Sequence, residues 1–156
     1  MATTNDELVD ELIRGGYLKT PTLIEAFREV NRADFIPEGL KEEAYMNIPL
    51  PIGFDQTISQ PLTVAFMLEL LLPQSGEKIL DIGTGSGWQA AIIAHTVGDS
   101  GKVIAVERIQ ELKEMADRHI AQYEDLKDRI EIILGDGSKG YEKEAPYDKI
   151  IAAAAA

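Results

Sequence analysis

The sequence predicts a doubly wound, mainly parallel α/β sheet preceded by a helical N-terminal segment. Beyond about residue 75, short β-rich runs alternate with longer helical patterns, which is typical of a parallel sheet with crossover helices. The apolar run 79–82 leads into Gly83, Gly85 and Gly87, and an apolar helical pattern follows. A strand, a glycine turn and a helix in this order let the backbone approach a ligand closely. The 156 residues suit one compact domain.

The N-terminal segment is expected to begin with two amphipathic helices, at residues 5–15 and 21–31. Gly15-Gly16 separates them, and Thr20-Pro21 starts the second, because proline fits the first helical turn. The composition changes around residues 74–76. We therefore expect an N-terminal helical segment with an active-site loop at residues 1–75 and an α/β core at residues 76–156.

Residues 36–61 are expected to be irregular, because four prolines interrupt them. So long a loop region in a compact domain usually carries function or covers a site. An apolar helix should follow from Pro61 to Leu72, and Ser59 is well placed to cap it.

The α/β core is expected to contain four strands and two helices. The expected strands are residues 78–82, 102–107, 129–134 and 147–152, and the expected helices are residues 87–97 and 109–123. The first three strands lead into Asp81 and Gly83, Glu107, and Asp136. Because ligands of such sheets bind beyond the carboxyl ends of the strands, we expect these residues to share one site.

Composition excludes several kinds of site. The net charge of −12 argues against nucleic-acid binding, because phosphate contacts need clustered Lys and Arg. The lack of cysteine excludes disulfides, zinc–thiolate centres and cysteine nucleophiles, and no metal site is expected. The N-terminus is polar and acidic, and apolar runs such as Ala65–Leu72 are too short to span a bilayer. A cytoplasmic protein without membrane contact is expected.

The strand ends fit a nucleotide-like cofactor. The glycine turn and the N–H groups that begin the next helix favour an anionic group. Glu107 can accept hydrogen bonds from both hydroxyls of a ribose, and Asp136 can either face an adenine amino group or form a simple turn with Gly137. NAD and S-adenosylmethionine fit these features almost equally well, because residues 85–90 also satisfy the dinucleotide fingerprint.

The region before the sheet resembles a known family. Residues 49–61, Pro-Leu-Pro-Ile-Gly-Phe-Asp-Gln-Thr-Ile-Ser-Gln-Pro, are similar to the signature of protein-L-isoaspartate O-methyltransferases. Residues 81–90, 106–109, 135–137 and 145–148 resemble further motifs of that family, in family order and at family spacing. The similarity extends from about residue 5 to the end of the chain.

The resemblance implies a Rossmann-like methyltransferase fold and a repair enzyme, a protein-L-isoaspartate (D-aspartate) O-methyltransferase. Such enzymes move the methyl group of S-adenosylmethionine onto the α-carboxylate of an L-isoaspartyl residue in damaged proteins and peptides. That carboxyl has a pKa of about 3.5, so it is ionised at neutral pH and needs no general base. Catalysis should then come mainly from positioning.

By analogy with the family, Ser59 is the expected catalytic residue, because its hydroxyl would orient the carboxylate. The same analogy assigns the methionine part to the glycine turn, the ribose to Glu107 and the adenine to Asp136-Gly137. The cofactor-binding residues implied in this way are Thr57, Ile58, Ser59, Gly83, Thr84, Gly85, Glu107, Asp136 and Gly137.

Family members usually continue with strands that complete a seven-stranded sheet, whereas this sequence stops at residues 150–156. The C-terminal strands are therefore expected to be missing, and the fourth strand to be an apolar edge through which the chain could self-associate. The alternative function is a non-catalytic S-adenosylmethionine- or isoaspartate-binding module without the C-terminal substrate part. A third, an NAD-binding oxidoreductase domain, finds no support in Thr57–Pro61.

Overall fold

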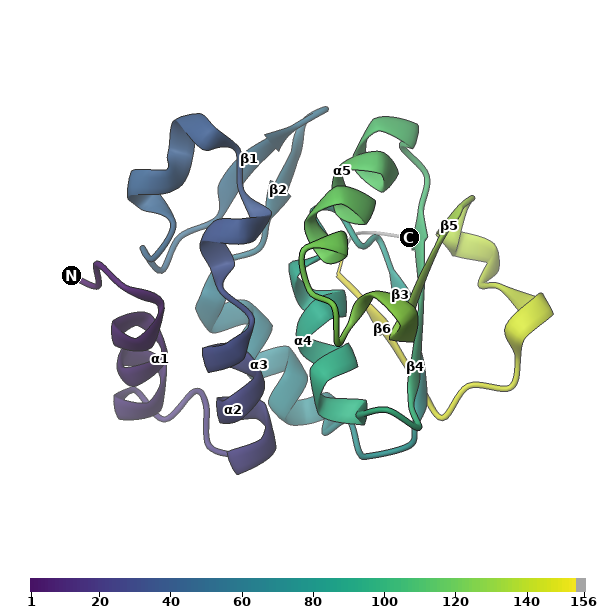
Figure 1. The fold of residues 1–156 in the computed structure, drawn as a ribbon, viewed down its shortest axis with the longest axis horizontal. Coiled ribbons are helices and arrows are strands. Elements are labelled where there is room, and N and C mark those ends of the chain that lie inside the picture. Colours follow the sequence, from purple (N-terminus) through teal and green to yellow (C-terminus); the bar gives the residue numbers. More distant parts are fainter. Residues whose placement is uncertain (154–156) are drawn as a thin grey trace. The chain divides into compact units, whose positions relative to one another are not determined.

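The computed structural model describes residues 1–153 (Figure 1). The chain divides into two compact units, Met1–Leu72 and Pro73–Ala156. The first unit contains helices and a small hairpin, and the second contains the sheet. No helix among the described residues is long and apolar enough to cross a membrane.

The first unit begins with two helices that start at favourable residues. Helix α1 spans Asn5–Arg14, and the side chain of Thr4 accepts a hydrogen bond from the N–H of Glu7 at 3.1 Å. Helix α2 spans Pro21–Glu29 and begins with proline, as expected. Both helices bury one apolar face, which explains the amphipathic pattern of the sequence.

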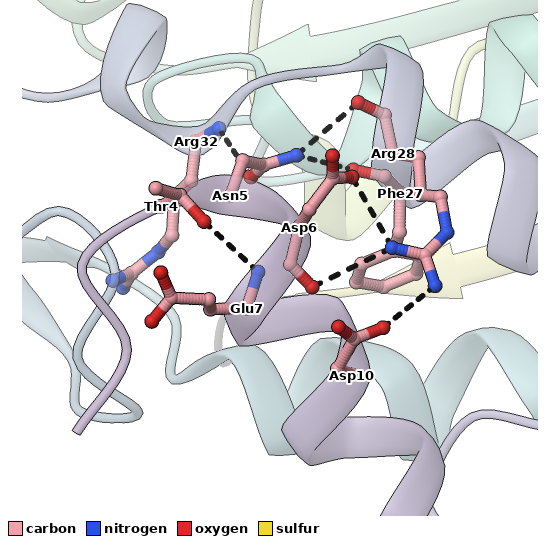
Figure 2. A network of polar contacts seen from close by, with 8 residues as sticks. All are labelled: Thr4, Asn5, Asp6, Glu7, Asp10, Phe27, Arg28 and Arg32. Atoms are coloured by element: carbon pink, nitrogen blue, oxygen red, sulfur yellow. Dashed lines mark hydrogen bonds and ion pairs between the residues drawn. The ribbon is translucent and has the colours of Figure 1, made fainter.

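Polar side chains join α1 to α2 (Figure 2). Arg28 of α2 pairs with Asp6 at 3.2 Å and with Asp10 at 2.8 Å. Asn5, which is buried at the start of α1, donates to the carbonyl of Phe27 at 2.9 Å. The amide therefore supplies a donor to a carbonyl in the last turn of α2, where carbonyls need partners from outside the helix.

Helix α3 spans Pro61–Leu71, and its cap differs from the expected one. The N-cap residue is Gln60, so the expectation that Ser59 caps this helix is wrong. Proline drives the preceding residue into an extended conformation, which places Gln60 at the helix boundary. The side chain of Asn47 takes over the role of the cap, because its Oδ1 accepts the N–H of Leu62 at 2.9 Å.

Residues 36–61 are more ordered than expected. They contain part of a regular hairpin, whose turn residues Phe54 and Asp55 have positive φ of 56° and 57°. A two-residue hairpin turn needs this mirror-type conformation, and Phe-Asp is not a sequence signature for it. Pro51 is a second reason why the sequence did not predict the hairpin, although proline is tolerated in an edge strand. The elements between α2 and α3 are η1 (Arg32–Phe35), η2 (Glu38–Glu43), β1 (Leu50–Gly53) and β2 (Gln56–Ile58), with β1 and β2 antiparallel.

The second unit is the predicted parallel sheet. Its strands lie in the order β5-β4-β3-β6, and all neighbouring strands are parallel, which confirms the doubly wound, Rossmann-like class. The strands are β3 (Lys78–Ile82), β4 (Lys102–Glu107), β5 (Ile130–Leu134) and β6 (Lys149–Ala152). The helices are α4 (Trp88–Val97) and α5 (Gln110–Ala121), with single turns at η3 (Lys127–Arg129), η4 (Gly137–Lys139) and η5 (Glu142–Glu144).

Helices α4 and α5 lie on one face of this sheet, and the segment with η4 and η5 lies on the other (Figure 1). The central strands β3 and β4 are buried along most of their length, and so is α4 on nearly every side. The strand β6 forms one edge of the described sheet, where Ile150 is 58% exposed. This order places the carboxyl ends of β3, β4 and β5 side by side.

Candidate active site

The glycine turn after β3 is held against the end of β4. The N–H of Gly83 donates to the carbonyl of Val106 at 2.8 Å. Gly83, Gly85 and Gly87 have φ of 78°, 55° and 93°, a region in which a side chain is strained. Gly87 begins α4 without a side-chain cap, an arrangement that suits an anionic ligand group at the helix start.

Glu107 fastens this turn with both carboxylate oxygens. Oε1 accepts the N–H of Gly85 at 2.9 Å, and Oε2 accepts the N–H of Ile109 at 3.0 Å. The side chain is buried, with 6% exposure. Because each carboxylate oxygen has two lone pairs, each can accept one further hydrogen bond, as two ribose hydroxyls require. The residues present therefore fit the ribose of a nucleoside cofactor.

Asp81, which lies in β3 just before the glycine turn, holds this turn through hydrogen bonds of its side chain. It is fully buried, and its carboxylate accepts hydrogen bonds from Thr84 Oγ1 at 3.3 Å and from Gln89 Nε2 at 3.1 Å. Burial raises the pKa of Asp81 to about 6, the two hydrogen bonds lower it, and the charge of Glu107 raises it further. The hydroxyl of Thr84, a predicted cofactor-binding residue, thus binds Asp81.

The turn after β5 contacts the ends of both β4 and β3. The N–H of Gly135 donates to the carbonyl of Glu107 at 3.0 Å, and a Cβ on Gly137 would lie 2.4 Å from Cγ2 of Ile82. Only glycine allows so close an approach to the end of β3. Asp136 is exposed, and its Oδ1 accepts hydrogen bonds from the N–H and hydroxyl of Ser138 at 3.0 and 2.7 Å. These bonds hold the pKa of Asp136 below its usual range.

Helix α5 packs against the glycine turn from outside the sheet. A Cβ on Gly87 would lie 3.3 Å from Cβ of Ala116 and 3.2 Å from Cδ1 of Ile120. One turn along the same face, Nδ1 of His119 forms a 2.8 Å hydrogen bond with the carbonyl of Ser86. Local sequence patterns do not indicate this pair, because the two residues lie 33 positions apart in the chain.

The remaining predicted site residues lie in the first unit. Thr57 is exposed on β2 and pairs with Pro51, whereas Ile58 points to the other face of the hairpin and is buried with 4% exposure. Ser59 follows β2 and is half-buried, and its carbonyl accepts a hydrogen bond from Arg32 Nη2 at 3.1 Å. Their predicted contacts with cofactor and substrate stay predictions.

The fold and the three adjoining strand ends define a Rossmann-like α/β protein with a candidate cofactor site at the carboxyl edge of its sheet. Within residues 1–153, no three His, Asp or Glu side chains are grouped so as to hold a metal ion. The chain matches the model of the protein-L-isoaspartate (D-aspartate) O-methyltransferase family over residues 3–156, and it belongs to that family.

Individual relatives agree with this assignment. The chain is 57% identical over 132 residues to protein-L-isoaspartate O-methyltransferase 2 of Archaeoglobus fulgidus, a match that covers 85% of this chain and 59% of the relative. It is 44% identical over 153 residues to the protein-L-isoaspartate O-methyltransferase of Methanopyrus kandleri, covering 97% of this chain and 66% of the relative. The chain thus spans about three fifths to two thirds of the length of these two relatives.

A solved structure confirms the fold. A putative protein-L-isoaspartate O-methyltransferase from Plasmodium falciparum, in complex with S-adenosyl-L-homocysteine, matches with a TM-score of 0.87. The match covers 99% of this chain and 75% of that one at 24% sequence identity.

Proposed function

We propose that this chain is an S-adenosylmethionine-dependent methyltransferase that acts on the α-carboxylate of L-isoaspartyl residues in damaged proteins and peptides. The observation that carries the proposal is the family match over residues 3–156. The glycine turn and the Glu107 carboxylate, which has acceptor capacity left for ribose hydroxyls, support the choice of cofactor. The predicted cytoplasmic location and self-association through β6 stay predictions.

The chemistry suits a site built for positioning. When bound, the cofactor would supply a methyl group on a sulfonium centre, so that in-line attack by an ionised carboxylate forms the ester O–C bond while the S–C bond breaks and S-adenosylhomocysteine leaves. The Ser59 hydroxyl donates a hydrogen bond to the substrate carboxylate and so fixes the direction from which the carboxylate attacks. Because the nucleophile is already ionised, the hydroxyl transfers no proton, and the rate gain comes from holding two reactants in line.

Each strand end has a separate task in binding the cofactor. Glu107 accepts hydrogen bonds from the ribose hydroxyls, and Gly83 and Gly85 let the backbone approach the methionine part. Asp136 and Gly137 face the adenine. The family resemblance further implies that Thr57 and Ile58 contribute to cofactor binding next to Ser59.

Methyl transfer from labelled S-adenosylmethionine to an isoaspartyl peptide tests the proposal, with the aspartyl twin of that peptide as control. We expect base-labile label on the isoaspartyl peptide alone. Ser59→Ala should lower turnover with little loss of affinity for S-adenosylhomocysteine, whereas Ser100→Ala, at an exposed serine before β4, should behave as wild type. Cofactor binding without any transfer would instead support the non-catalytic binding module.

A further inference from the structure

Arg32, at the start of η1, is a buried charge whose guanidinium binds backbone. It is 0% exposed. Nη1 donates to the carbonyls of Ala44 at 3.0 Å and Met46 at 3.1 Å, and Nη2 donates to those of Ile48 at 2.8 Å and Ser59 at 3.1 Å. Burial lowers the pKa of Arg32 to about 10, so the guanidinium remains charged at neutral pH.

These acceptors lie on both sides of the β1–β2 hairpin. Residues 44–48 enter the hairpin, and Ser59 directly follows it. A second bridge reinforces the first, because Gln60 Nε2 donates to the carbonyl of Asn47 at 3.0 Å. The backbone of the Ser59 segment is thus tied to residues 44–48 by one guanidinium and one amide.

Only arginine can make this contact. Its planar fork offers donors in fixed directions, whereas lysine is a point charge on a flexible stem with three donors. Burying a charge is costly unless it is well hydrogen-bonded, and the two Nη atoms of Arg32 donate to four carbonyls. A fold that needed only a packed core at this position could use an apolar side chain.

We propose that Arg32 is a positioning residue for Ser59, which it holds by binding the backbone where the chain enters and leaves the β1–β2 hairpin. The inference rests on the proposed function, in which the Ser59 hydroxyl orients the substrate carboxylate. A catalytic group that acts only through orientation loses its effect when its backbone moves, and a displacement of about 1 Å can cost about 100-fold in rate.

We call the Arg32 guanidinium, together with the backbone of residues 44–48 and 59 that it binds, the clamp. Asn5 connects the clamp to the N-terminal helices. Its Oδ1 accepts the backbone N–H of Arg32 at 3.3 Å, while its Nδ2 donates to the carbonyls of Phe27 at 2.9 Å and Arg28 at 3.2 Å (Figure 2). The start of α1 and the end of α2 therefore fix the backbone from which the guanidinium reaches the hairpin. This gives the helical segment a task in the reaction beyond stability.

The test compares Arg32→Lys with Arg28→Lys. Arg28 is a matched control, because it is an arginine of the same segment that pairs with Asp6 and Asp10 and binds no residue of 44–59. Hydrogen exchange of residues 44–48 and 59–60 reports the hold on the backbone. Steady-state methyl transfer to an isoaspartyl peptide reports the effect on the reaction, and calorimetric titration with S-adenosylhomocysteine reports the cofactor site.

We expect Arg32→Lys to speed exchange in both segments and to lower kcat about 10- to 100-fold, with a much smaller change in cofactor affinity and in the KM for S-adenosylmethionine. Arg28→Lys should match wild type in all of these measurements. Wild-type exchange and kcat in Arg32→Lys would overturn the inference. If Arg32→Lys does not fold, Asn5→Ala replaces it, since that change keeps the guanidinium and loosens its backbone.

The outcomes separate the inference from the function on which it rests. An active wild type with an unaffected Arg32→Lys overturns only the positioning role. A wild type that binds S-adenosylhomocysteine but never methylates the peptide overturns the proposed function, and the role of Arg32 in the reaction falls with it.

Discussion

Replacing Asp81 by asparagine is expected to stabilise the second unit at neutral pH. Burial raises the pKa of Asp81 to about 6, whereas an unfolded chain holds an aspartate near 3.9. The folded state therefore binds the proton more tightly, and this group makes the free energy of unfolding fall as the pH rises from about 4 through 6. The folded and unfolded pKa values of Asp81 differ by about two, and each pKa unit corresponds to about 1.36 kcal/mol, so the free energy of unfolding changes by about 3 kcal/mol.

Asp81→Asn removes the charge and keeps the shape. The amide oxygen can still accept from Gln89, and the amide nitrogen can donate to the Thr84 hydroxyl, which turns to accept. At pH 7 the free energy of unfolding of Asp81→Asn should exceed that of wild type by about 3 kcal/mol, reduced by the amount by which hydrogen bonds to a charged carboxylate are stronger than those to a neutral amide. The difference from wild type should vanish near pH 4.

The assay is denaturant unfolding at several pH values between 4 and 8. Trp88, the only tryptophan, is 2% exposed at the start of α4 and reports unfolding of the unit that contains Asp81. Asp125→Asn, at an exposed position, is the matched control and should run parallel to wild type. A constant difference between Asp81→Asn and wild type from pH 4 to pH 7 would refute the reasoning.

Three further changes test the strand ends and the helix α5 that packs against the glycine turn. Glu107→Gln should weaken S-adenosylhomocysteine binding about 10-fold or more in a calorimetric titration, because charged acceptors are worth about 1.5–3 kcal/mol each; wild-type affinity would refute the ribose assignment. Gly137→Ala should destabilise the fold by about 1–3 kcal/mol in urea unfolding, since its Cβ would meet Ile82 at 2.4 Å, and an unchanged midpoint would contradict that contact. His119→Phe, which loses the bond to the Ser86 carbonyl, should cost about 1 kcal/mol and weaken cofactor binding; the idea fails if both remain as in wild type.

The sequence predicted the sheet well because its strands are short apolar runs with clear ends. β3 and β4 begin and end at the predicted residues, while β6 begins at Lys149, after the predicted start at residue 147. Buried parallel strands and their glycine turns carry strong local signals. The hairpin was missed because its turn has no glycine and its first strand contains Pro51.

The partners within the candidate site could not be predicted from local patterns. The bonds from Gln89 to Asp81, from His119 to Ser86 and from Arg32 to Ser59 join residues 8, 33 and 27 positions apart. A signal for one of them exists in the sequence, because Gln89 interrupts an apolar helix, whereas Arg32 lies among other polar and charged residues and does not stand out. A polar residue at such a position indicates a buried partner without naming it.

The distribution of buried polar side chains supports a site built for positioning. Burying such groups costs free energy unless they are satisfied, so their places show where the fold accepts a cost in stability. Among residues 1–153 these side chains gather in two places, the clamp on the Ser59 segment and the glycine turn with its surroundings. Their members are Asn5 and Arg32 in the first place, and Asp81, Thr84, Ser86, Gln89 and Glu107 in the second. In both places, most of the hydrogen bonds join a side chain to the backbone and are not ion pairs between opposite charges. A reaction whose nucleophile is already ionised gains from rigid backbone and not from proton transfer, so this distribution agrees with the in-line methyl transfer that we propose.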